Sequence, residues 1–151
     1  MASRLLLVGI LAGSLSFAGC GSSGPELGDV HGTVNMDGKP LKLADVTFRR
    51  KDFTGRPSMG MTDENGYYTL GYSMDRNGAL LGDFVVEIST FRDMPGKDAD
   101  GKEIPTAPET VPMQYNSKSE LTAKVESGGQ EINFDLKSEG KMLNRGKKQF
   151  K

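Results

Sequence analysis

The feature that most constrains this chain is a two-residue alternation of apolar and polar side chains, which returns in segment after segment between residues 29 and 137. In "GDFVVEISTF", Phe84, Val86 and Ile88 share one face, while Glu87 and Ser89 share the other. This period puts alternate side chains on opposite faces of a strand. Because no segment carries a sustained 3.6-residue apolar period, the sequence predicts strands and no amphipathic helix.

Seven segments carry the pattern, separated by turns rich in Gly, Asp and Asn. They are "DVHGTVN", "ADVTFRR", "PSMGMT", "YYTLGY", "GDFVVEISTF", "ELTAKVES" and "QEINFDLK". Each predicted strand has one apolar face that another layer must cover. With a single cysteine, the chain has no internal disulfide and depends on its core. We therefore expect an all-β fold, a seven-stranded antiparallel sandwich of two sheets.

The chain begins with "MASRLLLVGILAGSLSFAGC", which has the features of a secretory signal. Arg4 gives a positive start, and an apolar stretch follows from Leu5 to Phe17. As a helix this stretch would span only about 20 Å at ~1.5 Å per residue, short of a ~30 Å hydrocarbon core. The sequence thus predicts a signal peptide over residues 1–19.

The cysteine that follows this segment indicates how the mature chain is held. Ala18, Gly19 and Cys20 resemble a bacterial lipobox, although Phe17 stands where that pattern prefers Leu. The resemblance implies that the Cys20 thiol receives a diacylglycerol, and two or three acyl chains anchor a protein firmly. We expect a membrane-anchored lipoprotein of the bacterial cell envelope, facing the periplasm or cell surface, with residues 20–28 as a flexible tether. The alternative is a secreted protein cut near Gly19, with a free thiol.

The segments "VHGTVNMDGKPLKLADVTF", "GMTDENGYYTL" and "GDFVVEIS" together resemble the carboxypeptidase-regulatory-like, transthyretin-like domain. The positions that match its turn-and-strand pattern are Thr62, Asp63, Gly66, Tyr68 and Leu70. Downstream, "VPMQYNSKSELTAKVESGGQEINFDL" resembles the ends of small lipoproteins of planctomycete-type bacteria. The resemblance implies that residues 29–137 form an immunoglobulin-like sandwich of prealbumin type. That fold hosts many functions, so it does not define one.

Two segments lack the strand pattern. Residues 92–114 contain four prolines, and connections of this length are usually functional or disordered. We expect this segment to be the contact surface for a partner. Residues 138–151 are rich in Lys and Arg, which predicts a solvated, mobile tail.

Two groups of acidic residues are candidates for cation binding. "DADGKE" offers Asp98, Asp100 and Glu103, oxygen ligands of the kind that calcium prefers, but without the spacing of an EF-hand loop. A weak calcium site and a solvated turn both remain open there. In "TDENG", Asp63 and its neighbours fit a turn better than a metal site.

Catalysis is not expected. His31 is the only histidine, which excludes a zinc site built on histidines, and no nucleophile motif lies near it. A net charge of -1 gives no reason to expect nucleic acid as a partner. Tyr67, Tyr72 and Tyr115 are the candidates for a sugar platform, in a chain without Trp.

These observations favour a non-catalytic, lipid-anchored envelope sandwich that acts as a binding or structural module. Its expected partners are the membrane, through its lipid, and an envelope protein or polysaccharide. No cofactor is expected. The alternative is a calcium- or carbohydrate-binding accessory module of an extracellular enzyme complex.

Overall fold

The computed structural model describes residues 24–98 and 100–142. Its strands are β1 (Leu27–Met36), β2 (Lys39–Pro40), β3 (Asp45–Arg50), β4 (Ser58–Met61), β5 (Tyr67–Thr69), β6 (Gly71–Ser73), β7 (Arg76–Asn77), β8 (Ala79–Leu80), β9 (Gly82–Ser89), β10 (Gly96–Lys97), β11 (Glu103–Ile104), β12 (Thr122–Val125), β13 (Gly128–Glu131) and β14 (Phe134–Leu136). A short 3-10 helix, η1 (Met113–Tyr115), is the one helical element in these ranges. All seven predicted segments contain strand, so the all-β prediction is confirmed. The segment "QEINFDLK" contains the end of β13 and all of β14, and the strands outside the seven segments, β2, β7, β8, β10 and β11, have two residues each.

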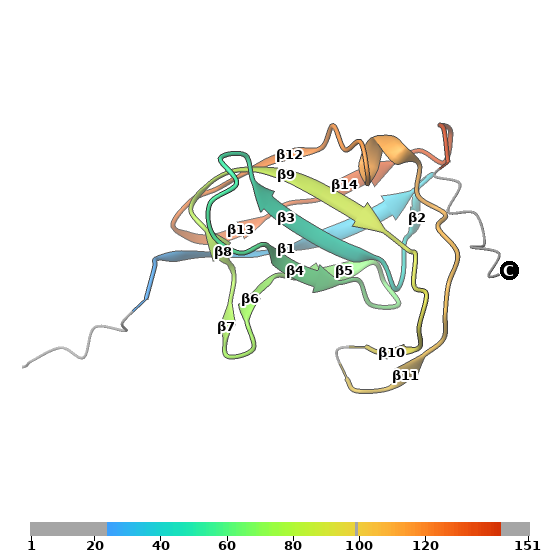
Figure 1. The fold of residues 1–151 in the computed structure, drawn as a ribbon, viewed down its shortest axis with the longest axis horizontal. Coiled ribbons are helices and arrows are strands. Elements are labelled where there is room, and N and C mark those ends of the chain that lie inside the picture. Colours follow the sequence, from blue (N-terminus) through green and yellow to red (C-terminus); the bar gives the residue numbers. More distant parts are fainter. Residues whose placement is uncertain (1–23, 99, 143–151) are drawn as a thin grey trace, which may run out of the picture.

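Two sheets face each other (Figure 1). The first is centred on β1, which pairs with β2, β5, β8, β13 and β14. The second has the order β12-β9-β3-β4-β6-β7. The expected two-sheet sandwich is therefore present.

The core lies between the sheets and is made by the predicted apolar faces. The side chains that are fully or almost fully buried come from both sheets and include Val30, Val34, Val46, Phe48, Tyr68, Leu70, Phe84, Val86, Ile88, Phe134 and Leu136. Phe48 is the centre of an aromatic group, with ring centroids 5.7 Å from Phe84 and 6.2 Å from Phe134. Burying each large side chain stabilises the fold by about 1.5–3 kcal/mol.

The predicted strand "YYTLGY" is divided between the two sheets. Its first half, β5, pairs with β1, whereas its second half, β6, pairs with β4 through Met59 and Gly71. Between them, Leu70 is fully buried. A Cβ at Gly60 would collide with the Thr69 carbonyl oxygen, so a residue without a side chain is needed where β4 passes this crossing.

One set of pairings in the sandwich is parallel. β13 and β14 both run parallel to β1, with Gly28 opposite Gly128 and Val34 opposite Phe134. Alternation predicts that a segment is a strand but not the direction of its partner. The other strand pairs are antiparallel, as expected.

Residues 92–114, here called the arm, are not a plain loop. Arg92 and Ala107 exchange two backbone hydrogen bonds of 2.9 Å at its base, and β10 and β11 pair further out. The arm projects away from the sandwich (Figure 1). Val111 belongs to the buried core cluster, which fixes the returning end of the arm to the sandwich, and Ile104 is buried within the arm.

The chain ends differ in part from the predicted boundaries. Cys20 and the predicted signal peptide lie outside the described residues. Because β1 begins at Leu27, the last two residues of the predicted tether belong to a strand. Within the predicted tail, Met113 donates its N–H to the Lys141 carbonyl at 2.8 Å. Across the described ranges, no helix has the length and apolar character to cross a membrane.

Candidate functional site

An open groove lies between the β6–β7 hairpin and the arm; we call it the interhairpin groove. Its volume is about 740 Å³. Its floor comes from β4 and β5, one wall from the hairpin and the other from the arm. The lining residues are Met59, Gly60, Met61, Asp63, Tyr67, Thr69, Gly71, Asn77, Lys97, Asp98 and Asp100.

The floor of the groove is apolar and open to solvent. Met59 is 56% exposed and Tyr67 is 43% exposed. Strand alternation explains this exposure, because their chain neighbours Ser58 and Tyr68 point into the core. Methionine is unbranched and polarizable, so it adapts to differently shaped apolar partners.

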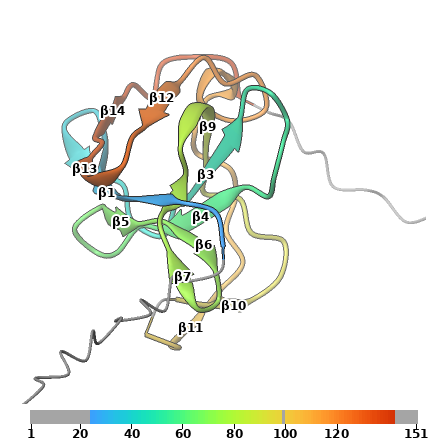
Figure 2. The ribbon, with the colours of Figure 1, turned by 90° about the vertical axis from the view of Figure 1, so that its left-hand side faces the viewer.

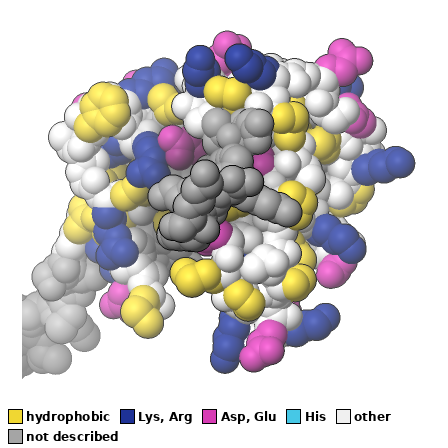
Figure 3. Space-filling view, turned by 45° about the vertical axis from the view of Figure 1, so that its right-hand side comes forward, with side chains coloured by type: hydrophobic (Ala, Val, Ile, Leu, Met, Phe, Trp, Pro, Cys, Tyr) yellow, Lys and Arg dark blue, Asp and Glu magenta, His cyan; other side chains and the backbone are white. Residues whose placement is uncertain are grey.

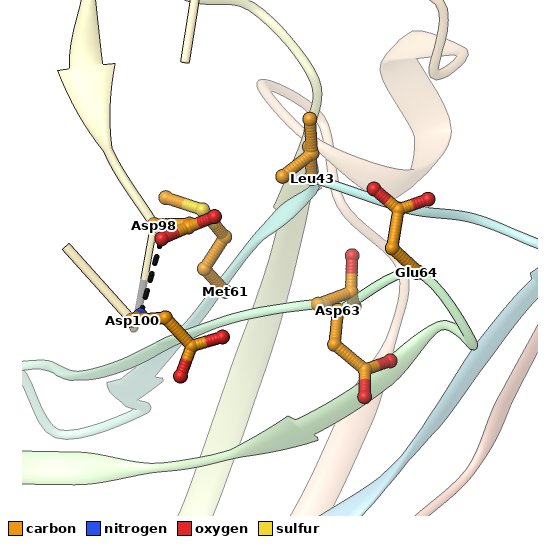
Figure 4. A pocket seen from close by; sticks show the side chains of 7 residues that line it. Leu43, Met61, Asp63, Glu64, Asp98 and Asp100 are labelled. Carbon is orange, nitrogen blue, oxygen red and sulfur yellow. Dashed lines mark hydrogen bonds between the residues drawn. The ribbon is translucent and has the colours of Figure 1, made fainter. Parts of the chain in front are cut away.

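The arm end of the groove is acidic. A pocket of about 90 Å³ lies there, and Asp63, Glu64, Asp98 and Asp100 contribute to its lining. Figure 4 shows Asp98 and Asp100 on one side of this pocket and Asp63 and Glu64 on the other. The fold thus brings together two acidic turns that are more than 30 residues apart in the chain.

The carboxylates also build their own turns. Asp63 accepts backbone N–H bonds from Asn65 at 2.8 Å and from Tyr67 at 2.9 Å. Asp98 does the same for Asp100 at 3.1 Å and Lys102 at 2.8 Å. Side-chain oxygens of Asp stabilise tight turns in this way. The predicted turn at residues 63–66 is confirmed.

The predicted calcium ligands are only partly brought together. Glu103 lies on β11, where it pairs with Lys97, and it does not line the pocket that Asp98 and Asp100 share. In the ranges that the structure describes, no group of three or more His, Cys, Asp or Glu side chains has the arrangement of a metal site. Calcium binding therefore stays a prediction.

Glu109 fixes the base of the arm. Its carboxylate accepts hydrogen bonds from the Ser89 hydroxyl at 2.6 Å, the Thr90 N–H at 3.0 Å and the Val111 N–H at 3.1 Å. This one side chain therefore connects the end of β9 to the chain that returns from the arm. The sequence around Glu109 does not predict this connecting role, because the residues that its carboxylate connects are about 20 positions apart in the chain.

An ion pair lies close to the same base. The Arg92 guanidinium is 3.9 Å from the Asp45 carboxylate and donates to the Leu43 carbonyl at 3.3 Å. Burial raises the pKa of Asp45 above its ordinary value, Arg92 opposes this shift, and the Glu109 charge adds to it. The base of the arm is thus a partly buried cluster of charges.

The remaining candidate side chains have different surroundings. Tyr67 lines the groove, with its ring centroid 6.1 Å from that of His31. The guanidinium groups of two arginines lie near the Tyr72 ring, and Tyr115 packs against the core. They form no shared platform. On the face that Figure 3 displays, acidic and basic side chains are interspersed with apolar ones.

Sequence reasoning missed the groove. In "SMGM", Met59 and Met61 are on the same face of the strand, the face away from Ser58, and this pattern was the one indication of an exposed apolar surface. Their exposure depends on the crossing of the two sheets and on the placement of the arm. Neither arrangement can be read from a local pattern.

Comparisons with known proteins find partial similarity to solved structures only. No family model matches the chain, and no curated protein matches it. Among solved structures, the major pilin subunit BcpA of Bacillus cereus has a TM-score of 0.46 at 13% identity, covering 76% of this chain and 31% of the pilin. A 9R-lipoxygenase from Cyanothece has a TM-score of 0.34 at 15% identity, covering 74% of this chain and 16% of the enzyme. The chain thus spans about a third of the pilin's length.

Proposed function

We propose that the protein is a non-catalytic β-sandwich of the bacterial cell envelope, anchored by lipid on Cys20. It binds an envelope protein or polysaccharide through the arm and the interhairpin groove. The resemblance of its sequence to the carboxypeptidase-regulatory-like domain and to planctomycete-type lipoproteins supports this proposal.

The observation that carries the binding role is the exposed apolar floor of the groove. Exposing apolar surface to water is unfavourable, and a partner that covers Met59 and Tyr67 removes that cost. Aromatic residues and methionine are enriched at protein interfaces. The ordered hairpin and arm on either side provide polar walls around this floor.

The binding role is tested by capture from envelope extract with the mature protein. The double variant Met59→Ser with Tyr67→Ser removes the apolar floor, whereas Phe53→Ser removes an exposed aromatic side chain outside the groove. We expect capture of a defined partner to fall at least about tenfold in the double variant, since each buried anchor contributes more than about 1 kcal/mol, and to persist in Phe53→Ser. Equal capture by all three proteins would refute the role of the groove. Enzymatic digestion of the captured material separates protein from polysaccharide.

The anchor is tested by incorporation of labelled palmitate. We expect label in the wild-type chain and none in Cys20→Ser, which should appear in the medium or periplasm. Unchanged release of the wild-type chain without label would show that Cys20 is not lipidated.

The calcium-binding accessory module is a second candidate. The placement of Asp98 and Asp100 opposite Asp63 and Glu64 favours it. Calorimetry with calcium on the unlipidated Cys20→Ser protein tests it. A heat of binding that is lost in Asp100→Asn would support it, and the absence of heat would remove it.

A further inference from the structure

The chain just before β1 is fixed to the β6–β7 hairpin. The Arg76 guanidinium donates to the Pro25 carbonyl at 2.6 Å, and a Cβ at Gly24 would collide with the same guanidinium. Figure 2 shows this segment running alongside the hairpin before β1 begins. The segment therefore reaches the sandwich beside the hairpin, with Glu26 bonded to the Ser127 hydroxyl on its other side.

The reach of the chain sets how far this hairpin lies from the anchor. Cys20 and Gly24 are four residues apart, and four residues span at most about 14 Å when fully extended. If Cys20 carries acyl chains, it lies at the bilayer surface. Gly24 then lies within about 14 Å of that surface, and the Arg76 side chain that it touches lies at most one side-chain length further away. This step rests on the lipid anchor proposed above.

The surface around the hairpin has the chemistry of a lipid headgroup contact. The guanidinium carbons of Arg56 and Arg76 lie 5.7 and 6.0 Å from the centre of the Tyr72 ring. Within the described ranges, Arg56 is exposed and forms no ion pair with a carboxylate. Guanidinium groups match the geometry of phosphate oxygens. Met74, between β6 and β7, is fully exposed and apolar.

Two acidic side chains lie nearby, and each accepts a hydrogen bond from a hydroxyl. Asp75 accepts one from the Ser73 hydroxyl at 2.7 Å, and this bond, together with the Arg76 charge, lowers the pKa of Asp75. Glu26 accepts one from the Ser127 hydroxyl at 2.6 Å. Arg56 has no such carboxylate beside it, so it is the cation most available to an external anion.

We infer that the β6–β7 hairpin, together with Arg56, docks on an anionic phospholipid surface. Arg56 and Arg76 bind lipid phosphates, and Met74 enters the headgroup layer. The far end of β1, where Met36 pairs with Lys39 of β2, faces away from the membrane. The lipid anchor thus holds the sandwich in one orientation rather than as a freely tumbling domain.

The test uses the lipidated full chain in vesicles and an introduced cysteine. Because Cys20 is the one natural cysteine and carries lipid, Met74→Cys gives a single thiol for a polarity-sensitive dye. Lys39→Cys, on β2 at the far end of β1, is the matched control at an exposed site. Vesicles contain phosphatidylcholine alone or phosphatidylcholine with phosphatidylglycerol.

We expect the dye at position 74 to emit at shorter wavelength and to be quenched from the lipid phase, more strongly with phosphatidylglycerol. The dye at position 39 should report water in both vesicles. Arg56→Gln should lower the ratio of inserted to free dye roughly fivefold, since one cation near an anionic surface contributes about 1 kcal/mol. Melting curves of the variants check that the fold is kept.

The possible failures are distinguishable by flotation of the protein with vesicles. If the protein floats with vesicles but the dye at position 74 reports water, the docking is refuted and the anchor stands. Equal insertion of wild type and Arg56→Gln would refute phosphate recognition by this residue. If the wild-type chain carries no acyl label and does not float, the anchor is refuted, and the docking with it.

Discussion

Two buried hydroxyl groups, in and beside β4, have opposite hydrogen-bonding situations. Ser58 and Thr62 are each 1% exposed. The Thr62 hydroxyl accepts the Ala44 N–H at 2.8 Å, whereas in the described ranges the Ser58 hydroxyl has no partner. A buried polar group without a partner keeps its full desolvation cost. One of these hydroxyls thus stabilises the fold and the other destabilises it.

We therefore expect Ser58→Ala to raise the free energy of unfolding by about 1 kcal/mol, because it removes the unsatisfied group. Thr62→Val is the matched variant. It should lower the free energy of unfolding by about 1–3 kcal/mol, because it leaves the Ala44 N–H without its acceptor. Urea unfolding measures both, and a loss of stability in Ser58→Ala would contradict the assignment.

The Tyr68 hydroxyl leads to a prediction for alkaline pH. It donates to the Ile132 carbonyl at 2.7 Å, and burial raises the pKa of Tyr68 above its ordinary value of 10.0. Below pH 10 both states keep the proton, so this group adds no pH dependence. Above pH 10 the unfolded chain loses the proton and the native chain keeps it, so stability falls as pH rises. Tyr68→Phe should remove this part of the loss. Unfolding measured from pH 8 to 12 checks it, and identical slopes for both proteins would contradict it.

At the scale of elements, the arm contains two paired strands that its sequence did not predict. Its strands are two residues long, too short for alternation to be visible. The long strands β1, β3 and β9 were predicted with their inward faces because a buried face requires regular apolar positions. The groove could not be predicted, since its lining comes from separate elements whose placement depends on tertiary packing.

The arm should loosen when its main polar connection is removed. Glu109→Ala takes away the acceptor of bonds from Ser89, Thr90 and Val111, so we expect faster hydrogen exchange and faster tryptic cleavage at Lys97 and Lys102. The amides of β3 and β9 should exchange as before.

Asp93→Ala, on the arm itself, is the matched control and should leave cleavage at Lys97 and Lys102 unchanged, because its exposed side chain has no part in that network. If both variants are cleaved at the wild-type rate, Glu109 does not hold the arm.

At the scale of the whole molecule, β1 joins the beginning and the end of the described chain. Ile132 donates its N–H to the His31 carbonyl at 2.8 Å, and the Thr33 N–H bonds to the Asn133 side chain at 2.7 Å. Between these contacts, a Cβ at Gly32 would collide with the Ile132 carbonyl oxygen. The close parallel contact of β1 with the C-terminal strands thus depends on a glycine.

Gly32→Ala should lower the free energy of unfolding by about 3 kcal/mol, because the two backbones must move apart. Gly129→Ala, in β13, is the control, since a Cβ there meets no atom within 4 Å. It should change the free energy of unfolding by less than about 0.5 kcal/mol. Equal effects of the two substitutions in denaturant unfolding would contradict this role of Gly32.

The pairing of β1 with β13 and β14 also determines when the sandwich is completed as the chain emerges. Partners opposite each other are 100 positions apart in the chain, as in Val34 and Phe134. Until the last of the intervening residues has emerged, one side of the central strand has nothing to pair with. Contacts across so long a loop form slowly, and domains dominated by them fold in milliseconds to seconds. The finished sandwich therefore appears only after nearly all of its residues have emerged.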